Sequence, residues 1–168
     1  MDPMKLDTKT CYIFRGPPGS GKTTVAERLT KTLPGLVYIS MDRYRTDEKG
    51  NYHFDPSKVA EDVKRMKEEF YQAVFRGELN VVLDNVHSRY WEYGWAAKQA
   101  YDFGYIVHVV EVQADLMTCF HRQRHPVPWD KLVEIFERWE TTVRMPDIKD
   151  ILGIMTKIIN RAGISGNM

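Results

Sequence analysis

The chain has 168 residues, of which 43% are hydrophobic and 28% are charged, and this ordinary globular composition argues against a disordered tail protein. Its 24 basic and 23 acidic side chains almost cancel, which excludes the strongly basic surface of a general nucleic-acid-binding protein. No apolar run approaches the roughly 20 residues of a membrane helix, and residues 1–10 lack the apolar core of a signal peptide. We therefore expect an intracellular, cytoplasmic protein that does not contact membranes.

Short apolar segments alternate with helical patterns along the chain. The predicted strands lie at 10–15, 36–40, 81–84 and 105–112. Helices are predicted at 22–33, from 55–57 onward, at 88–103, from about 129 onward and at 151–159. Apolar strands separated by helices form parallel sheets that are covered on both faces. We therefore predict one α/β domain over residues 1–168, with about four parallel strands, a flexible segment at 1–9 and a helical tail at 145–168.

Residues 16–23, GPPGSGKT, lie between the first predicted strand and the first predicted helix, and they fit the pattern GxxxxGK[ST]. Glycines let successive backbone N–H groups turn inward, and the following helix N-terminus adds partial positive charge, so such a loop binds phosphate. We expect Lys22 to contact the β- and γ-phosphates and Thr23 to bind Mg²⁺. The expected nucleotide-binding residues are Gly16, Pro17, Pro18, Gly19, Ser20, Gly21, Lys22, Thr23 and Thr24.

This loop predicts a P-loop kinase-type three-layer sandwich that binds ATP, or alternatively GTP, together with Mg²⁺. Thr24 stands directly behind the motif, and packing or helix capping is the alternative role for it. The length of the chain favours a small phosphotransferase over a motor or an oligomeric ATPase. A phosphotransferase needs a base for the acceptor hydroxyl, cations for the transferred charge and a means of excluding water.

Asp42 follows the second predicted strand closely, in the segment SMDRYR. Strand ends of a parallel sheet share the edge at which the phosphate loop lies, so Asp42 is a candidate general base. A helix-capping or surface carboxylate is the alternative. Arg45 could bind a phosphate or carboxylate of the substrate, or it could be an exposed arginine without a partner.

Asp84 ends the apolar strand VVLD, which is the arrangement of a Walker B acid that contacts Mg²⁺ directly or through water. In a kinase of this type the carboxylate could instead orient the substrate. Asn85, His87 and Arg89 follow on the same rim as candidate substrate contacts. For His87, a plain hydrogen-bonding role or a surface position is the alternative.

A helical lid is predicted over residues 114–128, and it contains the segment HRQRHPVP. Arg122 and Arg124 could fold over the triphosphate and neutralise the charge that builds up during transfer. A solvated basic helix face is the alternative for both arginines.

Five motifs occur in an order that is typical of one family: GPPGSGKTT, ISMDRYR, GNYHFDPS, VVLDNVHSRYWE and RQRHPVP. Through them the chain resembles, from about Cys11 to Glu140, the polynucleotide 5′-hydroxyl kinases of phage type and their small kinase-like relatives. The resemblance implies that Asp42 activates a nucleic-acid 5′-hydroxyl and that Arg45 contacts the 3′ phosphate of the acceptor nucleotide. It also implies that Asp84 organises acceptor or metal, and that Arg122 or Arg124 supplies the charge of the lid.

The chain departs from the pattern of that family at two places. Asp84-Asn85 is followed by Val86-His87 where the family has Thr-Asn, and the Arg-Asn pair of the lid is Arg122-Gln123. The leading hypothesis is an ATP- and Mg²⁺-dependent kinase of a nucleic-acid 5′-hydroxyl end, its expected partner. The first alternative is a kinase of a small hydroxylated metabolite such as a nucleoside or a sugar. The second is a nucleotide-dependent regulatory module.

Overall fold

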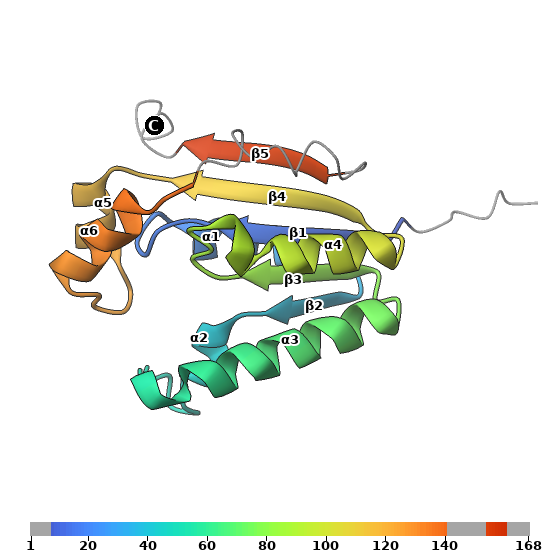
Figure 1. The fold of residues 1–168 in the computed structure, drawn as a ribbon, viewed down its shortest axis with the longest axis horizontal. Coiled ribbons are helices and arrows are strands. Elements are labelled where there is room, and N and C mark those ends of the chain that lie inside the picture. Colours follow the sequence, from blue (N-terminus) through green and yellow to red (C-terminus); the bar gives the residue numbers. More distant parts are fainter. Residues whose placement is uncertain (1–7, 141–153, 161–168) are drawn as a thin grey trace, which may run out of the picture.

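The computed structural model describes residues 8–140 and 154–160, which form a five-stranded parallel sheet in the order β2-β3-β1-β4-β5 (Figure 1). The strands are β1 (Thr10–Arg15), β2 (Leu36–Ile39), β3 (Asn80–Asp84), β4 (Ile106–Gln113) and β5 (Ile154–Asn160). The four predicted strands are confirmed, because each observed strand end lies within one residue of its predicted position.

The strand β5 corrects the prediction for the C-terminal part of the chain. A helix was predicted at 151–159, within a helical tail, but residues 154–160 extend the sheet and pair in parallel with β4. The segment IMTKIIN is rich in β-branched residues, which favour strands, and the open edge of β4 offers unpaired backbone groups. The sheet therefore has five strands instead of about four. The rest of the predicted tail and residues 1–7 lie outside the described residues.

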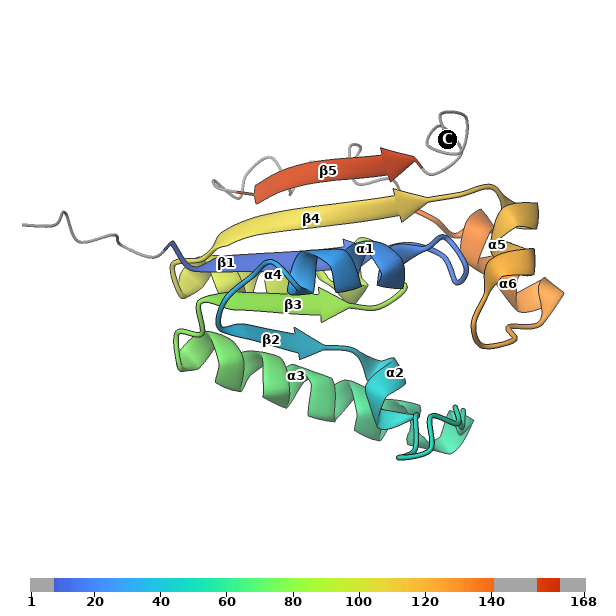
Figure 2. The same ribbon diagram turned by 180° about the vertical axis from the view of Figure 1, so that it is seen from behind.

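The helices lie on both faces of the sheet and at its carboxyl end. Their bounds are α1 (Lys22–Thr30), α2 (Met41–Tyr44), α3 (Val59–Phe75), α4 (Gly94–Asp102), α5 (Leu116–Arg122) and α6 (Trp129–Glu137). Two 3₁₀ turns, Pro56–Lys58 and Tyr90–Glu92, precede α3 and α4. Helices α3 and α4 cover one face of the sheet, and α1 covers the other, as Figures 1 and 2 show from opposite sides.

The alternation of side chains along the strands builds two apolar cores. Cys11 and Ile13 of β1 belong to the larger core with α3 and α4, in which Phe70 is fully buried. Phe14 points to the opposite face and packs near Ala26 of α1 in the smaller core. Because successive strand residues face opposite sides, one apolar strand can serve both layers. This three-layer arrangement places the carboxyl ends of β1, β2 and β3 at one edge.

Candidate active site

The loop between β1 and α1 has a backbone path that only glycine can follow at two positions. Gly19 has a φ of +81°, and a Cβ there would lie 2.0 Å from the carbonyl oxygen of Cys119. At Gly16 a Cβ would lie 2.5 Å from the carbonyl oxygen of Val112. Any side chain would therefore force the loop away from β4 and α5, which hold it closed. Gly16 and Gly19 are therefore required by the close approach of other backbone, a reason that the sequence pattern did not give.

The same loop offers unused polar groups to a ligand. Gly21 caps α1 and has no side chain that could bond the N–H groups of the first helical turn, so these groups can bind an anion. The hydroxyl of Ser20 is buried and has no hydrogen-bond partner among the described residues. Buried polar groups of this kind are normally satisfied. A nucleotide phosphate therefore fits the loop, and Lys22 and Thr23 begin the helix that follows it.

Lys22 is paired with Asp84 at the carboxyl end of β3. The Lys22 Nζ lies 2.6 Å from Asp84 Oδ1, and the two side chains are only 12% and 3% exposed. The hydroxyl of Tyr38, on the neighbouring strand β2, donates a hydrogen bond to the other carboxylate oxygen. The structure thus brings together the predicted phosphate-binding lysine and the predicted Walker B acid. A bound triphosphate would compete with Asp84 for the lysine.

Tyr38 is a residue of the site that sequence reasoning missed. Within the apolar segment LVYI it looks like an ordinary strand former, since aromatic residues are common in strands. Burial and, next, the charge of Asp84 raise the pKa of the Tyr38 phenol, so it remains a hydrogen-bond donor. Tyr38 therefore holds the Asp84 carboxylate by a bond that does not involve Lys22.

Asp42 lies in the first turn of α2, directly beyond β2, and its side chain is exposed. Its Oδ1 is 3.4 Å from the hydroxyl of Tyr52. Ser40, and not Asp42, is the N-cap of α2, so the helix-capping alternative for Asp42 does not apply. An exposed carboxylate at this edge of the sheet is accessible to an acceptor hydroxyl.

Arg45 has partners in the fold, so the alternative of an exposed arginine without a partner is wrong. Its Nε lies 2.8 Å from Asp62 Oδ2 on α3, and its Nη1 is 3.4 Å from the Tyr52 hydroxyl. The guanidinium also lies over the ring of Phe54, 5.0 Å from the centroid. Tyr52 therefore bridges Asp42 and Arg45, and Asp62 orients the arginine beside the candidate base.

The residues after Asp84 on the rim are mostly buried and hold the surrounding backbone. The Asn85 Oδ1 accepts a hydrogen bond from the backbone N–H of Met41 at 3.1 Å, which ties the end of β3 to the start of α2. His87 is 4% exposed, and its Nδ1 lies 2.9 Å from the carbonyl oxygen of Phe14. A carbonyl only accepts, so Nδ1 carries the proton. Arg89 is exposed at the beginning of the next turn.

His87 makes stability depend on acid pH. Burial lowers the pKa of its imidazole to about 4 from an ordinary 6.5, so the unfolded chain binds the proton more readily than the folded protein. Stability is fully present above pH 6.5 and is lost as the pH falls towards 4. We expect the free energy of unfolding in urea to drop by about 2 kcal/mol between about pH 7.5 and pH 5 from this group.

The measurement compares wild type with His87→Gln, which removes the titrating group and keeps a donor for the Phe14 carbonyl. The variant should have a smaller difference in unfolding free energy between the two pH values. His121→Gln, at an exposed lid position, is the matched control and should behave as wild type. If the unfolding free energy of His87→Gln drops as much at low pH as that of wild type, groups other than His87 cause the drop.

The segment predicted as a lid, residues 114–128, is held by bonds within its own turn and by an ion pair to α1. The Gln123 side chain bonds both backbone groups of Val127. Its amide oxygen accepts from the Val127 N–H at 3.0 Å, and its amide nitrogen donates to the Val127 carbonyl at 3.1 Å. The Nη1 of Arg124 lies 3.3 Å from Glu27 Oε1 on α1. Arg122 is exposed in the last turn of α5 and has no ion pair among the described residues. Of the two arginines predicted for the lid, only Arg124 has an ion pair among the described residues.

Arg15 is a second residue that sequence reasoning missed, because it ends a segment that was interpreted only as a buried strand. Its side chain is fully buried and lies 3.2 Å from Glu111 on β4. It donates to the carbonyl oxygens of His87, Ser88 and Glu140. This contact set joins the base of the phosphate loop to β4, to the β3 rim and to the segment after α6.

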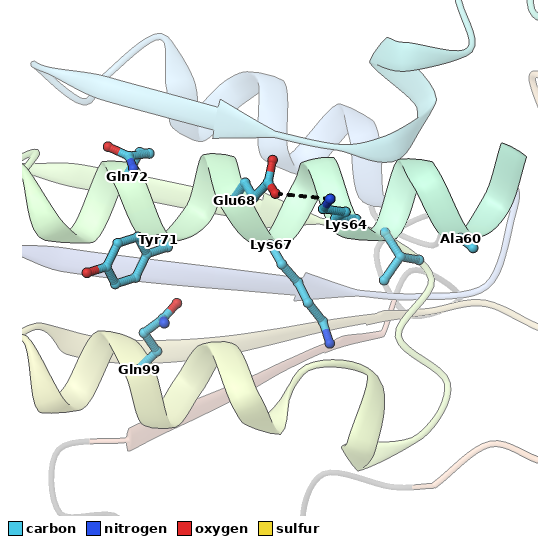
Figure 3. Close-up of a pocket in the computed structure, with 8 residues that line it drawn as sticks. Ala60, Lys64, Lys67, Glu68, Tyr71, Gln72 and Gln99 are labelled. Carbon is cyan, nitrogen blue, oxygen red and sulfur yellow. Dashed lines mark ion pairs between the residues drawn. The ribbon is translucent and has the colours of Figure 1, made fainter.

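A groove of about 450 Å³ lies elsewhere, between α3 and α4 (Figure 3). It is lined by Ala60, Val63, Lys64, Lys67, Glu68, Tyr71, Gln72 and Gln99. Lys64 and Glu68 form an ion pair at 4.0 Å within it. None of the predicted site residues lines the groove, so it is separate from the phosphate loop.

Within the described ranges, 8–140 and 154–160, no three His, Cys, Asp or Glu side chains gather into a metal site made of protein ligands alone. Over the same residues, no helix combines the length and the apolar character needed to cross a bilayer.

Two features define a P-loop nucleotide-binding protein. They are a parallel sheet with a glycine loop before α1, and a lysine of that loop beside a carboxylate at a strand end. The sequence model of the AAA domain family matches residues 12–125. The chain therefore belongs to this AAA domain family.

Cytidylate kinase of Sulfurisphaera tokodaii is 30% identical over 140 residues, covering 79% of this chain and 72% of that protein. This similarity places the chain among the P-loop kinases. Human YLP motif-containing protein 1 (Homo sapiens) is 27% identical over 157 residues, covering 79% of this chain and 7% of that protein. The chain thus spans only a small part of this longer relative.

The Pnkp1/Rnl/Hen1 RNA repair complex contains a chain that superposes with a TM-score of 0.64. The sequence identity is 15%, and the match covers 82% of this chain and 46% of that chain. A similarity at this level of identity shows a shared fold.

Proposed function

We propose that the protein is an ATP- and Mg²⁺-dependent kinase that transfers the γ-phosphoryl group to the 5′-hydroxyl of a nucleic acid. The observation that supports this is the joint placement of Asp42, Arg45 and Lys22. The Tyr52 hydroxyl bridges Asp42 and Arg45. Tyr38, four residues before Asp42 in the chain, bonds to Asp84. Asp84 in turn pairs with Lys22. An exposed carboxylate, an oriented guanidinium and a phosphate loop thus share one edge of the sheet.

The residues can carry out the transfer as follows. Asp42 accepts the proton of the 5′-hydroxyl as its oxygen bonds to the γ-phosphorus, and the bond from that phosphorus to the β,γ-bridging oxygen breaks to release ADP. Lys22 and a lid arginine neutralise the charge on the transferred group. Thr23 and Asp84 are oxygen donors that would hold Mg²⁺, whose charge offsets that of the phosphates. Closure of the lid excludes water, which would otherwise compete as an acceptor.

A kinase of a small hydroxylated metabolite is the second candidate function, and the similarity to a cytidylate kinase favours it. The base, lysine and lid would act in the same way, and the difference lies in the size of the acceptor. A nucleotide-dependent regulatory module is the third candidate. It would bind nucleotide without transferring phosphate to any acceptor.

The test uses γ-labelled ATP, Mg²⁺ and four acceptors: RNA with a 5′-hydroxyl, DNA with a 5′-hydroxyl, a nucleoside 3′-monophosphate, and a pool of nucleosides and sugars. Label on an oligonucleotide end is the expected result. The amounts of label on RNA and on DNA show which polymer is the better acceptor. Label in the small-molecule pool alone would favour the second candidate. Bound ATP with no labelled acceptor would favour the third.

Arg45→Ala is expected to raise the KM of acceptors that carry a 3′ phosphate by about tenfold, because a charge-assisted hydrogen bond to the phosphate is lost. Acceptors without that phosphate should change little. Steady-state kinetics on a nucleoside 3′-monophosphate and on the matching nucleoside make the comparison. Arg65→Ala, at an exposed arginine paired with Glu69 on α3, is the control. Equal losses on both acceptors would contradict a phosphate contact by Arg45.

A further inference from the structure

The lid and the loop that follows α2 meet in an aromatic contact. The rings of Tyr52 and His125 are stacked, with centroids 3.9 Å apart and an angle of 14° between the planes. His125 belongs to the lid turn after α5, and both side chains are half-buried. The small angle and the short distance show that the two rings are stacked nearly face to face.

Tyr52 lies immediately beside the candidate base. Its hydroxyl is 3.4 Å from Asp42 Oδ1 and 3.4 Å from Arg45 Nη1. The hydroxyl end of the Tyr52 side chain therefore lies where an acceptor hydroxyl would bind. The aromatic ring extends away from that point. A nucleotide whose 5′-hydroxyl approaches Asp42 carries its base next to that hydroxyl, within reach of this ring.

The loop around Tyr52 is held in place by local bonds. Residues Thr46 and Tyr52 form an antiparallel bridge, and the Asp47 carboxylate accepts from the N–H groups of Lys49 and Asn51. The N–H of His53 donates to the carbonyl of Arg45 at 2.7 Å. The phenol ring is thus supported by its own loop, whereas the ring that covers it comes from the lid.

We propose that Tyr52 is the stacking platform for the base of the 5′-terminal acceptor nucleotide, and that His125 covers this platform until the base replaces it. The proposal rests on the proposed function and names the part of the acceptor that the site recognises. The imidazole is itself a flat nitrogen heterocycle, so the observed pair shows the orientation a base would adopt. Stacking on an aromatic ring tolerates every base, so the platform selects a nucleotide end without selecting its sequence.

Fluorescence of 2-aminopurine tests the platform without requiring catalysis. An oligonucleotide with a 5′-hydroxyl carries 2-aminopurine at its terminal position, and a second carries it at an internal position. Wild type should quench the terminal probe more strongly than the internal one. Tyr52→Ala should abolish this difference and weaken binding about tenfold, while Tyr52→Phe should preserve the quenching. Tyr71→Ala, at an exposed tyrosine of α3, is the matched control and should quench as wild type does.

The role of His125 has its own variant. His125→Ala should tighten binding of the terminal-probe oligonucleotide by about threefold, because the base no longer competes with the imidazole for the ring. Weaker binding in both His125→Ala and Tyr52→Ala, with no terminal quenching in wild type, would overturn the proposal and leave the ring pair as a lid contact. If Tyr52→Ala does not fold, as judged by its thermal midpoint, Tyr52→Leu takes its place.

The platform and the proposed function fail in different ways. Quenching of the terminal probe without phosphoryl transfer to any nucleic acid would support the platform and contradict the kinase of a 5′-hydroxyl end. Transfer of label to the oligonucleotide with an unquenched terminal probe in wild type would support the kinase and contradict the platform.

Discussion

Asp42→Asn is expected to lower the rate of phosphoryl transfer by about 10³-fold while the affinity for ATP stays unchanged. The amide has the size of the carboxylate but cannot take the proton of the acceptor hydroxyl. Asp42 lies on α2, outside the phosphate loop, and its exposed side chain has its nearest bond to Tyr52. Loss of the charge should therefore leave the nucleotide site intact. Single-turnover transfer from labelled ATP gives the rate, and equilibrium dialysis gives the ATP affinity.

Asp102→Asn is the matched control for this prediction. Asp102 is an exposed aspartate on α4 whose carboxylate pairs with Lys98 at 2.7 Å. Its substitution should leave both the transfer rate and the ATP affinity at the wild-type level. Near-normal turnover of Asp42→Asn would show that another group takes the proton.

Lys22→Ala is expected to lower kcat/KM for the nucleotide by about 10²- to 10³-fold, because a cation aimed at the transferred phosphate is lost. The same change removes the partner of Asp84, whose side chain is 3% exposed. Breaking a buried ion pair from one side costs about 3 kcal/mol or more. The variant should therefore lose stability as well as activity, and urea unfolding measures the loss.

Two further variants separate the catalytic loss from the loss of stability. Lys22→Ala combined with Asp84→Asn should recover part of the stability, since the amide leaves no unpaired charge beside Tyr38, but it should recover no activity. Lys31→Ala changes an exposed lysine at the end of α1 and should match wild type in both measurements. Efficient use of the nucleotide by Lys22→Ala would contradict the assignment of the phosphate-binding lysine.

The phosphate loop and the first four strands could be predicted from the sequence because their determinants are local. A short apolar strand, a glycine loop and a helix start follow one another directly in residues 10–30, and the loop conformation depends on glycines at fixed spacing. The sequence also predicted that Asp42, just beyond β2, and Asp84, at the end of β3, lie at the same edge of the sheet. Parallel strands end at a common edge.

The contacts that make these residues a site depend on the order of the strands. Because β3 lies between β1 and β2, Asp84 meets Lys22 on one side and Tyr38 on the other. The same tertiary packing buries Arg15 against Glu111, stacks Tyr52 on His125, and adds a fifth strand where a helix was predicted. Sequence patterns encode local conformation and burial, whereas the partner of a buried polar group is set by which distant segments the fold places beside it.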